Sequence, residues 1–363
     1  MSAALLPLRV LQNRIGVVPR PSYCTYLVCN RCNARCSMCD SWKVPRGYEM
    51  TPREVGIVFG KVGALDVVRL TGGEPFLRKD LVKIAAHILE ASNPSVLHLT
   101  TNGSFPDRAE AFCRQLDTPQ RLWVMVSVDG LAREHDHNRG RSATLAKAYD
   151  TVRRLAALGR DCVRVSVNHT IISNQSLADH DELCQMFAPL GVDVQWVLAY
   201  ESSAMYGLAR RGTRADDLVR RHGYPLCLGI DRELALEFMQ RDSLRAHPLR
   251  DPMVQVGKRY YLSGLFPRLA RSEHPRPQPK CVALRSHLRL LPDGGVPVCQ
   301  FNTELVGNLV TDSFEQVWNG AAACNQRAWV DACSGCWAEC EVMPNAVYSG
   351  DVWRGLFPAR RRH

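Results

Sequence analysis

The chain alternates between strand-like and helix-like segments from about residue 22 onwards, and this alternation limits its fold more than any other feature. The strand-like segments are rich in β-branched or aromatic residues and are bounded by Gly, Asn or Asp. Repeated β–α units imply a parallel sheet with crossover helices. In such barrels the active site lies at the carboxyl ends of the strands. We expect strands at Cys24–Val28, Val67–Thr71, Val96–Thr101, Trp123–Val128, Val163–Ile172 and Val192–Ala199, and helices at Pro52–Val62, Leu77–Ala91, Asp107–Leu116, Ala143–Leu158 and Leu177–Leu190.

Three cysteines follow the first expected strand, spaced as Cys32-x3-Cys36-x2-Cys39. A loop this short can present three thiolates to three irons, whereas a closed [4Fe–4S] cluster takes four cysteines. Three ligands would leave one iron open, as catalytic zinc sites leave one position open. Cys29 leaves an alternative, because it could close the cluster as in an electron carrier. A zinc ribbon fits less well, since its CxxC pairs usually stand about 15–20 residues apart.

Polar groups end the second and third expected strands. Gly72 and Gly73 would let the backbone approach a ligand closely, and Glu74 offers a fixed acceptor. An ordinary turn before a helix is the alternative. Asn102 ends the third strand in an Asn-Gly pair, which also favours a simple turn.

The fourth expected strand ends in Ser127 and Asp129, followed by a polar segment that reads as a loop over 135–140. The histidines of this segment do not have the spacing of a zinc motif. Arg139 within it is suited to bidentate pairing with a carboxylate.

A second group of cysteines lies near the carboxyl end of the chain. Cys281 and Cys299 flank the turn residues 293–295, and the spacing suits a hairpin that delivers two thiolates. A later loop would deliver two more from Cys333 and Cys336. A zinc site remains the alternative, because four cysteines with a CxxC pair also fit zinc.

Together these motifs resemble those of radical S-adenosylmethionine (radical SAM) enzymes. The resemblance implies a partial barrel in which the open iron chelates the amino and carboxylate groups of SAM. The cluster then cleaves SAM, and a 5′-deoxyadenosyl radical abstracts hydrogen from the substrate. Many members have an aromatic residue before the last cysteine of the loop, where this chain has the apolar, polarizable Met38.

The resemblance also implies roles for the residues at the strand ends. Gly72, Gly73 and Glu74 would hold the amino group of SAM. Ser127 and Asp129 would contact its ribose or carboxylate, and Arg139 would pair with the carboxylate. The further candidate contacts with SAM are Asn102, Asn168 and Gln195.

The C-terminal region resembles the SPASM and Twitch extensions of this family, which hold auxiliary [4Fe–4S] clusters. A full SPASM domain uses seven cysteines, and this region has six, of which Cys324 stands alone in a helix-like stretch. We therefore expect one auxiliary cluster, closer to Twitch, on Cys281, Cys299, Cys333 and Cys336. Cys340 is then surplus. It could replace one ligand of the CxxC pair, or it could donate a hydrogen atom to a substrate radical. Cys227 is a second candidate for the hydrogen donor.

The composition agrees with a metalloenzyme in a reducing compartment. The chain of 363 residues has fifteen cysteines, most of them in clusters, and a formal net charge of +10. That charge fits an anionic substrate, nucleic acid or simply a soluble enzyme, but no basic stripe with interleaved aromatic residues favours nucleic acid. No apolar run is long enough to span a bilayer, and the first residues lack the pattern of a signal peptide. We therefore expect a cytoplasmic protein without a membrane span.

These observations predict a partial (β/α)6 TIM-like barrel with a C-terminal iron–sulfur extension. The expected divisions are a lead-in at 1–21, the barrel at 22–214, a bridging helical segment at 215–280, the auxiliary region at 281–345 and a basic tail at 346–363.

The expected function is hydrogen abstraction from a substrate, followed by dehydrogenation, epimerisation or bond formation. The substrate is a small metabolite, such as a sugar or aminocyclitol, or a peptide, and the electron donor is a flavodoxin or ferredoxin. No separate peptide-recognition segment precedes the barrel, which favours a small metabolite. The alternative is a non-catalytic iron–sulfur protein, which would use Cys29 as a fourth ligand.

Overall fold

A single curved parallel sheet forms the centre of the molecule. The computed structural model describes residues 6–116, 118, 120–200, 226–227, 229–244, 252–272, 274–333 and 335–355. Within these ranges, seven strands pair in the order β6-β5-β4-β3-β2-β1-β7, and every pairing is parallel. The sheet is open between β6 and β7 and is therefore a partial barrel, as predicted. Its strands are β1 (Tyr23–Cys29), β2 (Val67–Gly72), β3 (Val96–Thr101), β4 (Leu122–Ser127), β5 (Arg164–Ile171), β6 (Asp193–Leu198) and β7 (His287–Leu290).

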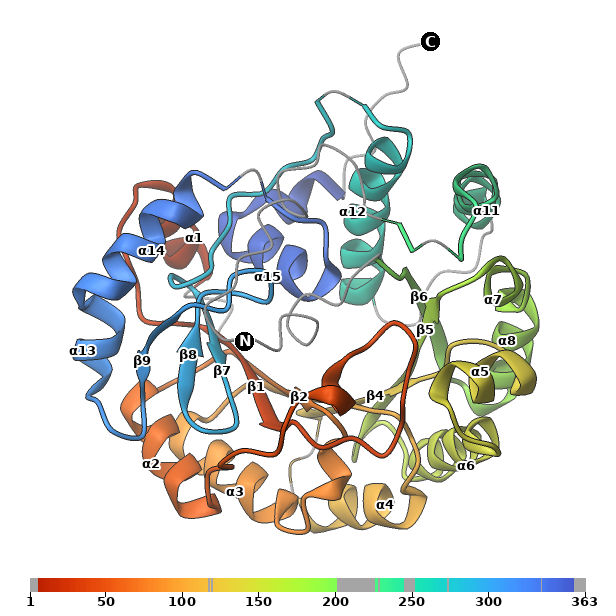
Figure 1. The fold of residues 1–363 in the computed structure, drawn as a ribbon, viewed down its shortest axis with the longest axis horizontal. Coiled ribbons are helices and arrows are strands. Elements are labelled where there is room, and N and C mark those ends of the chain that lie inside the picture. Colours follow the sequence, from red (N-terminus) through yellow and green to blue (C-terminus); the bar gives the residue numbers. More distant parts are fainter. Residues whose placement is uncertain are drawn as a thin grey trace.

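The crossover helices lie around the outer face of this sheet (Figure 1). They begin where local sequence favours a helix. For example, Thr51 and Glu54 form a reciprocal capping box at the start of α2. The helices of this part are α2 (Pro52–Val62), α3 (Leu81–Ser92), α4 (Pro106–Gln115), α5 (Ala132–Arg139), α6 (Thr144–Ala157), α7 (Asn174–Ala178) and α8 (His180–Phe187), with short 3-10 turns η1 (Ser41–Lys43), η2 (Pro75–Leu77) and η3 (Ala188–Leu190).

Alternate residues of each strand face opposite sides of the sheet. On β1, Cys24, Tyr26 and Val28 are buried in the apolar core between the sheet and the helices. Tyr23 and Thr25 therefore face the barrel interior. This alternation continues on the neighbouring strands and gives the interior a polar lining.

The C-terminal region is joined to the barrel rather than separate from it. β7 pairs with β1, and the antiparallel pair β8 (Gly295–Pro297) and β9 (Leu305–Asn308) follows it. In Figure 1, α12 and α15 lie across the opening between β6 and β7. The remaining helices are α1 (Leu6–Arg14), α11 (Arg232–Leu244), α12 (Pro252–Leu269), α13 (Phe314–Asn319), α14 (Ala321–Asp331), α15 (Glu339–Ser349) and the 3-10 turn η4 (Asp351–Gly355).

Several expectations differ from the structure. The helix expected over Leu177–Leu190 is divided into α7, α8 and η3. The segment 135–140 is not a loop, because most of it forms the end of α5. The expected hairpin between Cys281 and Cys299 is also wrong, since β7 joins the barrel sheet and β8 pairs with β9 instead. The first part of the expected basic tail forms the end of α15 and the turn η4 instead. Residues 356–363 of that tail, and the part of the bridging segment before residue 226, lie outside the described residues.

Candidate functional site

The cysteine loop leaves the carboxyl end of β1 and packs against the end of β2. The backbone N–H of Gly73 donates to Cys29 O at 2.8 Å, and that of Glu74 donates to Arg31 O at 2.8 Å. A Cβ atom at Gly73 would lie 2.0 Å from Arg31 O, and one at Gly72 would lie 2.2 Å from Cys29 O. Close contact with the cysteine loop therefore explains why both positions are glycine.

Glu74 is completely buried between β2 and β3. Its carboxylate accepts hydrogen bonds from Phe76 N at 3.0 Å, Thr101 Oγ1 at 2.8 Å and Asn102 N at 2.8 Å. Burial raises the pKa of Glu74, and these hydrogen bonds oppose the shift. The Asn102 side chain in turn donates to Asn33 Oδ1 at 2.8 Å, so it holds the cysteine loop.

The last turn of α5 covers the cysteine loop from the other side. Arg139 donates to Cys36 Sγ at 3.4 Å and pairs with Asp129 Oδ2 at 2.7 Å. Burial opposes ionisation of Arg139, but the charges of Asp129 and Cys36 raise its pKa. Gly140 ends the helix with φ of +63°, a left-handed conformation in which glycine lacks the strain of other residues.

Asn138 connects three parts of this site and was missed by sequence reasoning. Its Nδ2 donates to Asp129 Oδ2 at 2.6 Å and to Met38 Sδ at 3.4 Å, while its Oδ1 accepts from Ser37 Oγ at 2.5 Å. The only signal in the sequence was its position beside Arg139. Its burial, which gives these contacts their importance, depends on the tertiary fold.

His135 fixes the backbone beside Asp129. Its Nδ1 accepts from Asp129 N at 3.0 Å, and burial lowers the pKa of His135 to about 4. The ring is therefore neutral at neutral pH. Asp129 Oδ1 and Arg139 Nε are buried without a hydrogen-bond partner among the described residues. Buried polar atoms are nearly always paired in folded proteins, so these two atoms fit a bound polar ligand such as SAM.

The three thiols of the loop lie within electrostatic range of one another. Burial raises the pKa of Cys36 to about 12, and negative charge on Cys39 or Cys32 would raise it further. Among the described residues, no three His, Cys, Asp or Glu side chains converge on one metal-ion position.

The second set of cysteines also comes together. The thiol of Cys336 is within electrostatic range of Cys281 and Cys299, and Cys281 is within range of Cys333. Phe301 and Ala338 form the small apolar cluster beside Cys299, Cys333, Cys336 and Cys340.

The direction of hydrogen bonding differs among the cysteines, although Cys324 both donates and accepts. A thiolate can only accept hydrogen bonds, whereas a thiol can donate one. Three expected ligands, Cys32, Cys299 and Cys333, accept from the backbone N–H two residues later. A fourth, Cys36, accepts from Arg139. Hydrogen bonds to the sulfurs are one of the features that tune iron–sulfur clusters, so this donor set fits such clusters.

Other cysteines donate to carbonyl oxygens instead. Cys29 donates to Glu74 O at 3.3 Å, Cys162 to Cys113 O at 3.8 Å and Cys324 to Asn319 O at 3.6 Å. Cys29 therefore has the hydrogen bonding of a protonated thiol and not of a fourth cluster ligand.

The two expected hydrogen donors lie in different places. Cys340 donates to Gln300 Oε1 at 2.9 Å, and it lies on α15 beside the second cysteine set. Cys227 donates its backbone N–H to Ala199 O at 3.0 Å, just beyond the carboxyl end of β6.

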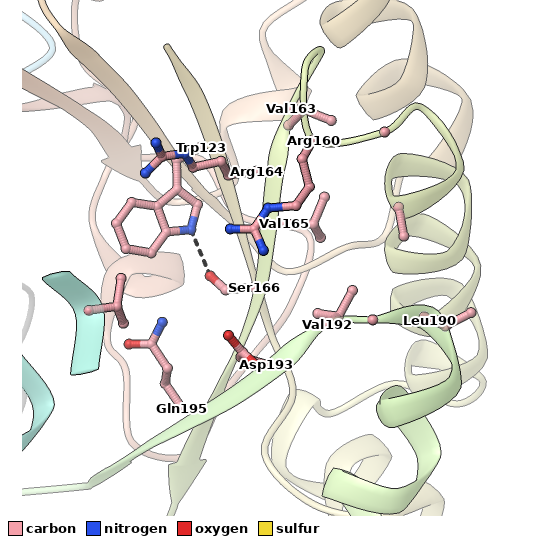
Figure 2. Close-up of a pocket in the computed structure, with 14 residues that line it drawn as sticks. Trp123, Arg160, Val163, Arg164, Val165, Ser166, Leu190, Val192, Asp193 and Gln195 are labelled. Carbon is pink, nitrogen blue, oxygen red and sulfur yellow. Dashed lines mark hydrogen bonds between the residues drawn. The ribbon is translucent and has the colours of Figure 1, made fainter. Parts of the chain in front are cut away.

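Three further candidate contacts with SAM lie on the interior face of the sheet. Ser127, Asn168 and Gln195 are in register across β4, β5 and β6. The Ser127 carbonyl accepts from Arg139 at 3.3 Å, and Asn168 Nδ2 donates to Thr170 Oγ1 at 3.1 Å. Gln195 lines a pocket near the amino ends of these strands (Figure 2).

Comparisons with known proteins identify the two cysteine regions. The Radical SAM superfamily profile matches residues 26–187. The chain belongs to the radical SAM superfamily. An iron-sulfur cluster-binding domain profile, SPASM, matches residues 281–337, which include four cysteines of the second set but not Cys340. The two profile matches therefore confirm the predicted cofactors, which are a SAM-binding [4Fe–4S] cluster, SAM and an auxiliary cluster.

The named relatives are only distantly similar to this chain in sequence. A GTP 3',8-cyclase of Aquifex aeolicus is 32% identical over 178 residues, covering 46% of this radical SAM protein and 53% of the cyclase. The chain thus spans about half the length of that relative. A pre-heme d1 synthase of Dinoroseobacter shibae is 26% identical over 311 residues, covering 80% of this chain and 71% of the synthase.

Solved structures share the fold. SuiB of Streptococcus suis bound to S-adenosylmethionine has a TM-score of 0.61 at 13% identity, covering 88% of this chain and 70% of SuiB. The enzyme anSMEcpe with bound AdoMet has a TM-score of 0.56 at 16% identity, covering 93% of this chain and 96% of anSMEcpe. In the ranges that the structure describes, no helix of this radical SAM protein is long and apolar enough to cross a bilayer.

Proposed function

We propose that this radical SAM protein abstracts a hydrogen atom from a small metabolite or a peptide, leading to dehydrogenation, epimerisation or bond formation. When bound, the cluster and SAM supply the 5′-deoxyadenosyl radical for that step. The observation that supports the proposal most is the cysteine loop. Two of its sulfurs, Cys32 Sγ and Cys36 Sγ, accept hydrogen bonds, while Cys29, which could have closed the cluster, donates its own.

The residues around this loop would position SAM. Arg139 lies against Cys36, and among the described residues neither its Nε nor Asp129 Oδ1 has a hydrogen-bond partner. Together they would bind the charged end of SAM, with Ser127, Asn102 and Asn168 as further contacts. Gly72, Gly73 and Glu74 would hold the amino group of SAM, as the family resemblance implies. These roles follow the family resemblance and the position of each residue at a strand end.

The class of substrate has two candidates. The cyclase and synthase relatives are named for small molecules, GTP and pre-heme d1. One SuiB structure instead contains the precursor peptide SuiA. An external donor such as flavodoxin or ferredoxin would supply the electron for SAM cleavage, and the auxiliary cluster on Cys281, Cys299, Cys333 and Cys336 could accept the second electron of an oxidation.

Cys340 is the better candidate for a hydrogen donor in a redox-neutral reaction. Its thiol donates a hydrogen bond to Gln300 and is within electrostatic range of Arg69, an interior residue of β2. Cys227 lies beyond β6 and is the second candidate. With Cys340 as donor, product formed in D2O carries deuterium, and the Cys340→Ser variant loses product while still cleaving SAM. Deuterated product from that variant contradicts the assignment.

The overall proposal is tested by anaerobic incubation of the iron-loaded protein with SAM and dithionite. We expect 5′-deoxyadenosine from the wild type and none from Cys36→Ala, because that variant lacks one of three ligands. Cys324→Ala is the matched control, since Cys324 is exposed and lies outside both sets. If the iron-loaded wild type forms no 5′-deoxyadenosine, or Cys36→Ala forms as much, the protein is instead a non-catalytic iron–sulfur protein.

A further inference from the structure

A row of polar side chains crosses the interior of the barrel at one level. Thr25 on β1 pairs in register with Arg289 on β7 and with Arg69 on β2. Arg69 in turn pairs with His98 on β3, and His98 with Trp123 on β4. Residues in register on parallel strands point to the same face of a sheet. Since Cys24 and Tyr26 face the helices, this row faces the interior.

The two arginines of the row have different surroundings. Arg289 is paired with Glu341, which also lies 3.3 Å from His287. Arg69 has no hydrogen-bond or ion-pair partner among the described residues, and its Nε is buried. Arg69 is half-buried, and a cation withdrawn from water without a partner is costly. Its presence in the interior therefore suggests that a negatively charged partner binds there.

The acidic groups near Arg69 do not neutralise it directly. Glu339 is within electrostatic range of Arg69 but is shared with Lys258, and burial raises the pKa of Glu339. Glu341 is occupied by Arg289 and His287. Tyr23 and Cys340 are the other ionisable groups near Arg69, and burial raises the pKa of both. The protein thus leaves a positive charge at Arg69.

Further atoms along this face also lack partners. His98 Nδ1, Thr100 Oγ1 and Arg289 Nε are buried and make no hydrogen bond with any described residue. Thr100 lies two residues after His98 on β3, so it shares the same face one level nearer to the carboxyl end. Unpaired polar atoms at several interior positions fit a polar ligand better than an empty apolar core.

A pocket opens beside the other end of the row (Figure 2). Trp123 and Ser166 line it and are joined by a hydrogen bond of 2.8 Å. Trp123 also packs edge-on against His98, with 5.1 Å between the ring centroids. Trp123 therefore contacts both this pocket, near the amino ends of β4 to β6, and His98 of the row.

We propose that Arg69, with His98 and Thr100 beside it, binds an oxyanion of the substrate, either a carboxylate or a phosphate, inside the barrel. This rests on the proposed function, because it takes the interior beneath the cysteine loop as the substrate site. The planar guanidinium fork suits a bidentate contact with either group. The substrate would thereby be an anionic molecule held with its reactive carbon toward the carboxyl ends of the strands.

Isothermal titration calorimetry of the iron-loaded protein, without SAM and at constant ionic strength, tests this with two probes. Pyrophosphate represents the phosphate source and glutarate the carboxylate source. We expect at least one probe to bind saturably at one site per chain, and Arg69→Gln to weaken that binding by at least about tenfold. Arg114→Gln is the control, because it removes the same charge from an exposed position on α4.

Saturable binding that Arg69→Gln leaves unchanged, an equal loss in Arg114→Gln, or no saturable binding of either probe overturns the proposal. Iron content shows whether Arg69→Gln has folded. If that variant does not bind iron, Arg69→Lys replaces it and should bind the probe several-fold more weakly, because lysine lacks the fork; equal binding overturns the proposal. The titration requires no SAM cleavage, so its failure is distinguishable from failure of the proposed function.

Discussion

Gly73 shows how one residue can determine whether the cysteine loop forms. A Cβ at this position would lie 2.0 Å from Arg31 O and 2.7 Å from Asn30 O, both backbone atoms that cannot move independently of the loop. We expect Gly73→Ala to displace the loop and to remove about four iron atoms per chain, the content of one cluster. Iron content and the electron paramagnetic resonance signal of the dithionite-reduced protein would measure this.

Gly60→Ala is the control for that prediction. Gly60 lies within α2, and a Cβ there meets nothing within 4 Å, so alanine should be neutral or slightly stabilising. Gly73→Ala with the full wild-type iron content would contradict the close contact seen here.

At the scale of single elements, α5 is the helix that anchors the cysteine loop. Asn138 binds Ser37 and Asp129 from its last turn. Loss of buried hydrogen bonds costs about 1–3 kcal/mol where a partner stays unsatisfied. We therefore expect Asn138→Ala to lose the loop's cluster to a chelator roughly ten times faster than the wild type. The decay of the visible absorbance of the cluster in the presence of chelator would measure this rate.

His137→Ala separates the role of Asn138 from that of the helix itself. His137 precedes Asn138 on α5 and is exposed, so its replacement should leave the rate unchanged. Equal acceleration by both variants would mean that helix stability, and not the contact with Ser37, determines retention of the cluster.

Elements with local signals were predictable, and those with distant partners were not. The bounds of α2 follow from Thr51, Pro52 and Glu54, which all act within one turn. The segment 135–140 is polar and gives no apolar period, so its local sequence does not indicate a helix. Its helix is stabilised by contacts with the cysteine loop about 100 residues earlier, such as Arg35 N to Arg139 O at 2.9 Å. The pairing of β7 with β1 likewise joins segments more than 250 residues apart.

At the scale of the whole molecule, that pairing places the auxiliary region against the barrel. The cysteine sets were predictable because spacing alone brings thiols together. The interior row was not, because Arg69 and Arg289 become neighbours of Thr25 only when β2, β1 and β7 lie side by side. The net charge fitted an anionic substrate, nucleic acid or simply a soluble enzyme, and it gave no position for a partner.

The two cysteine sets should bind their clusters independently, because no residue belongs to both. Replacing Cys32, Cys36 and Cys39 together by alanine removes the ligands of the loop but leaves every N–H donor of the second set in place. We expect this variant to retain about four of about eight iron atoms per chain. Quantitative iron and sulfide analysis of the anaerobically reconstituted protein would measure the content. Cys333→Ala combined with Cys336→Ala is the reciprocal variant, which should keep the loop's cluster and lose the other. Complete loss of iron from the triple variant, with the fold retained by circular dichroism, would rule out an auxiliary cluster on these four cysteines.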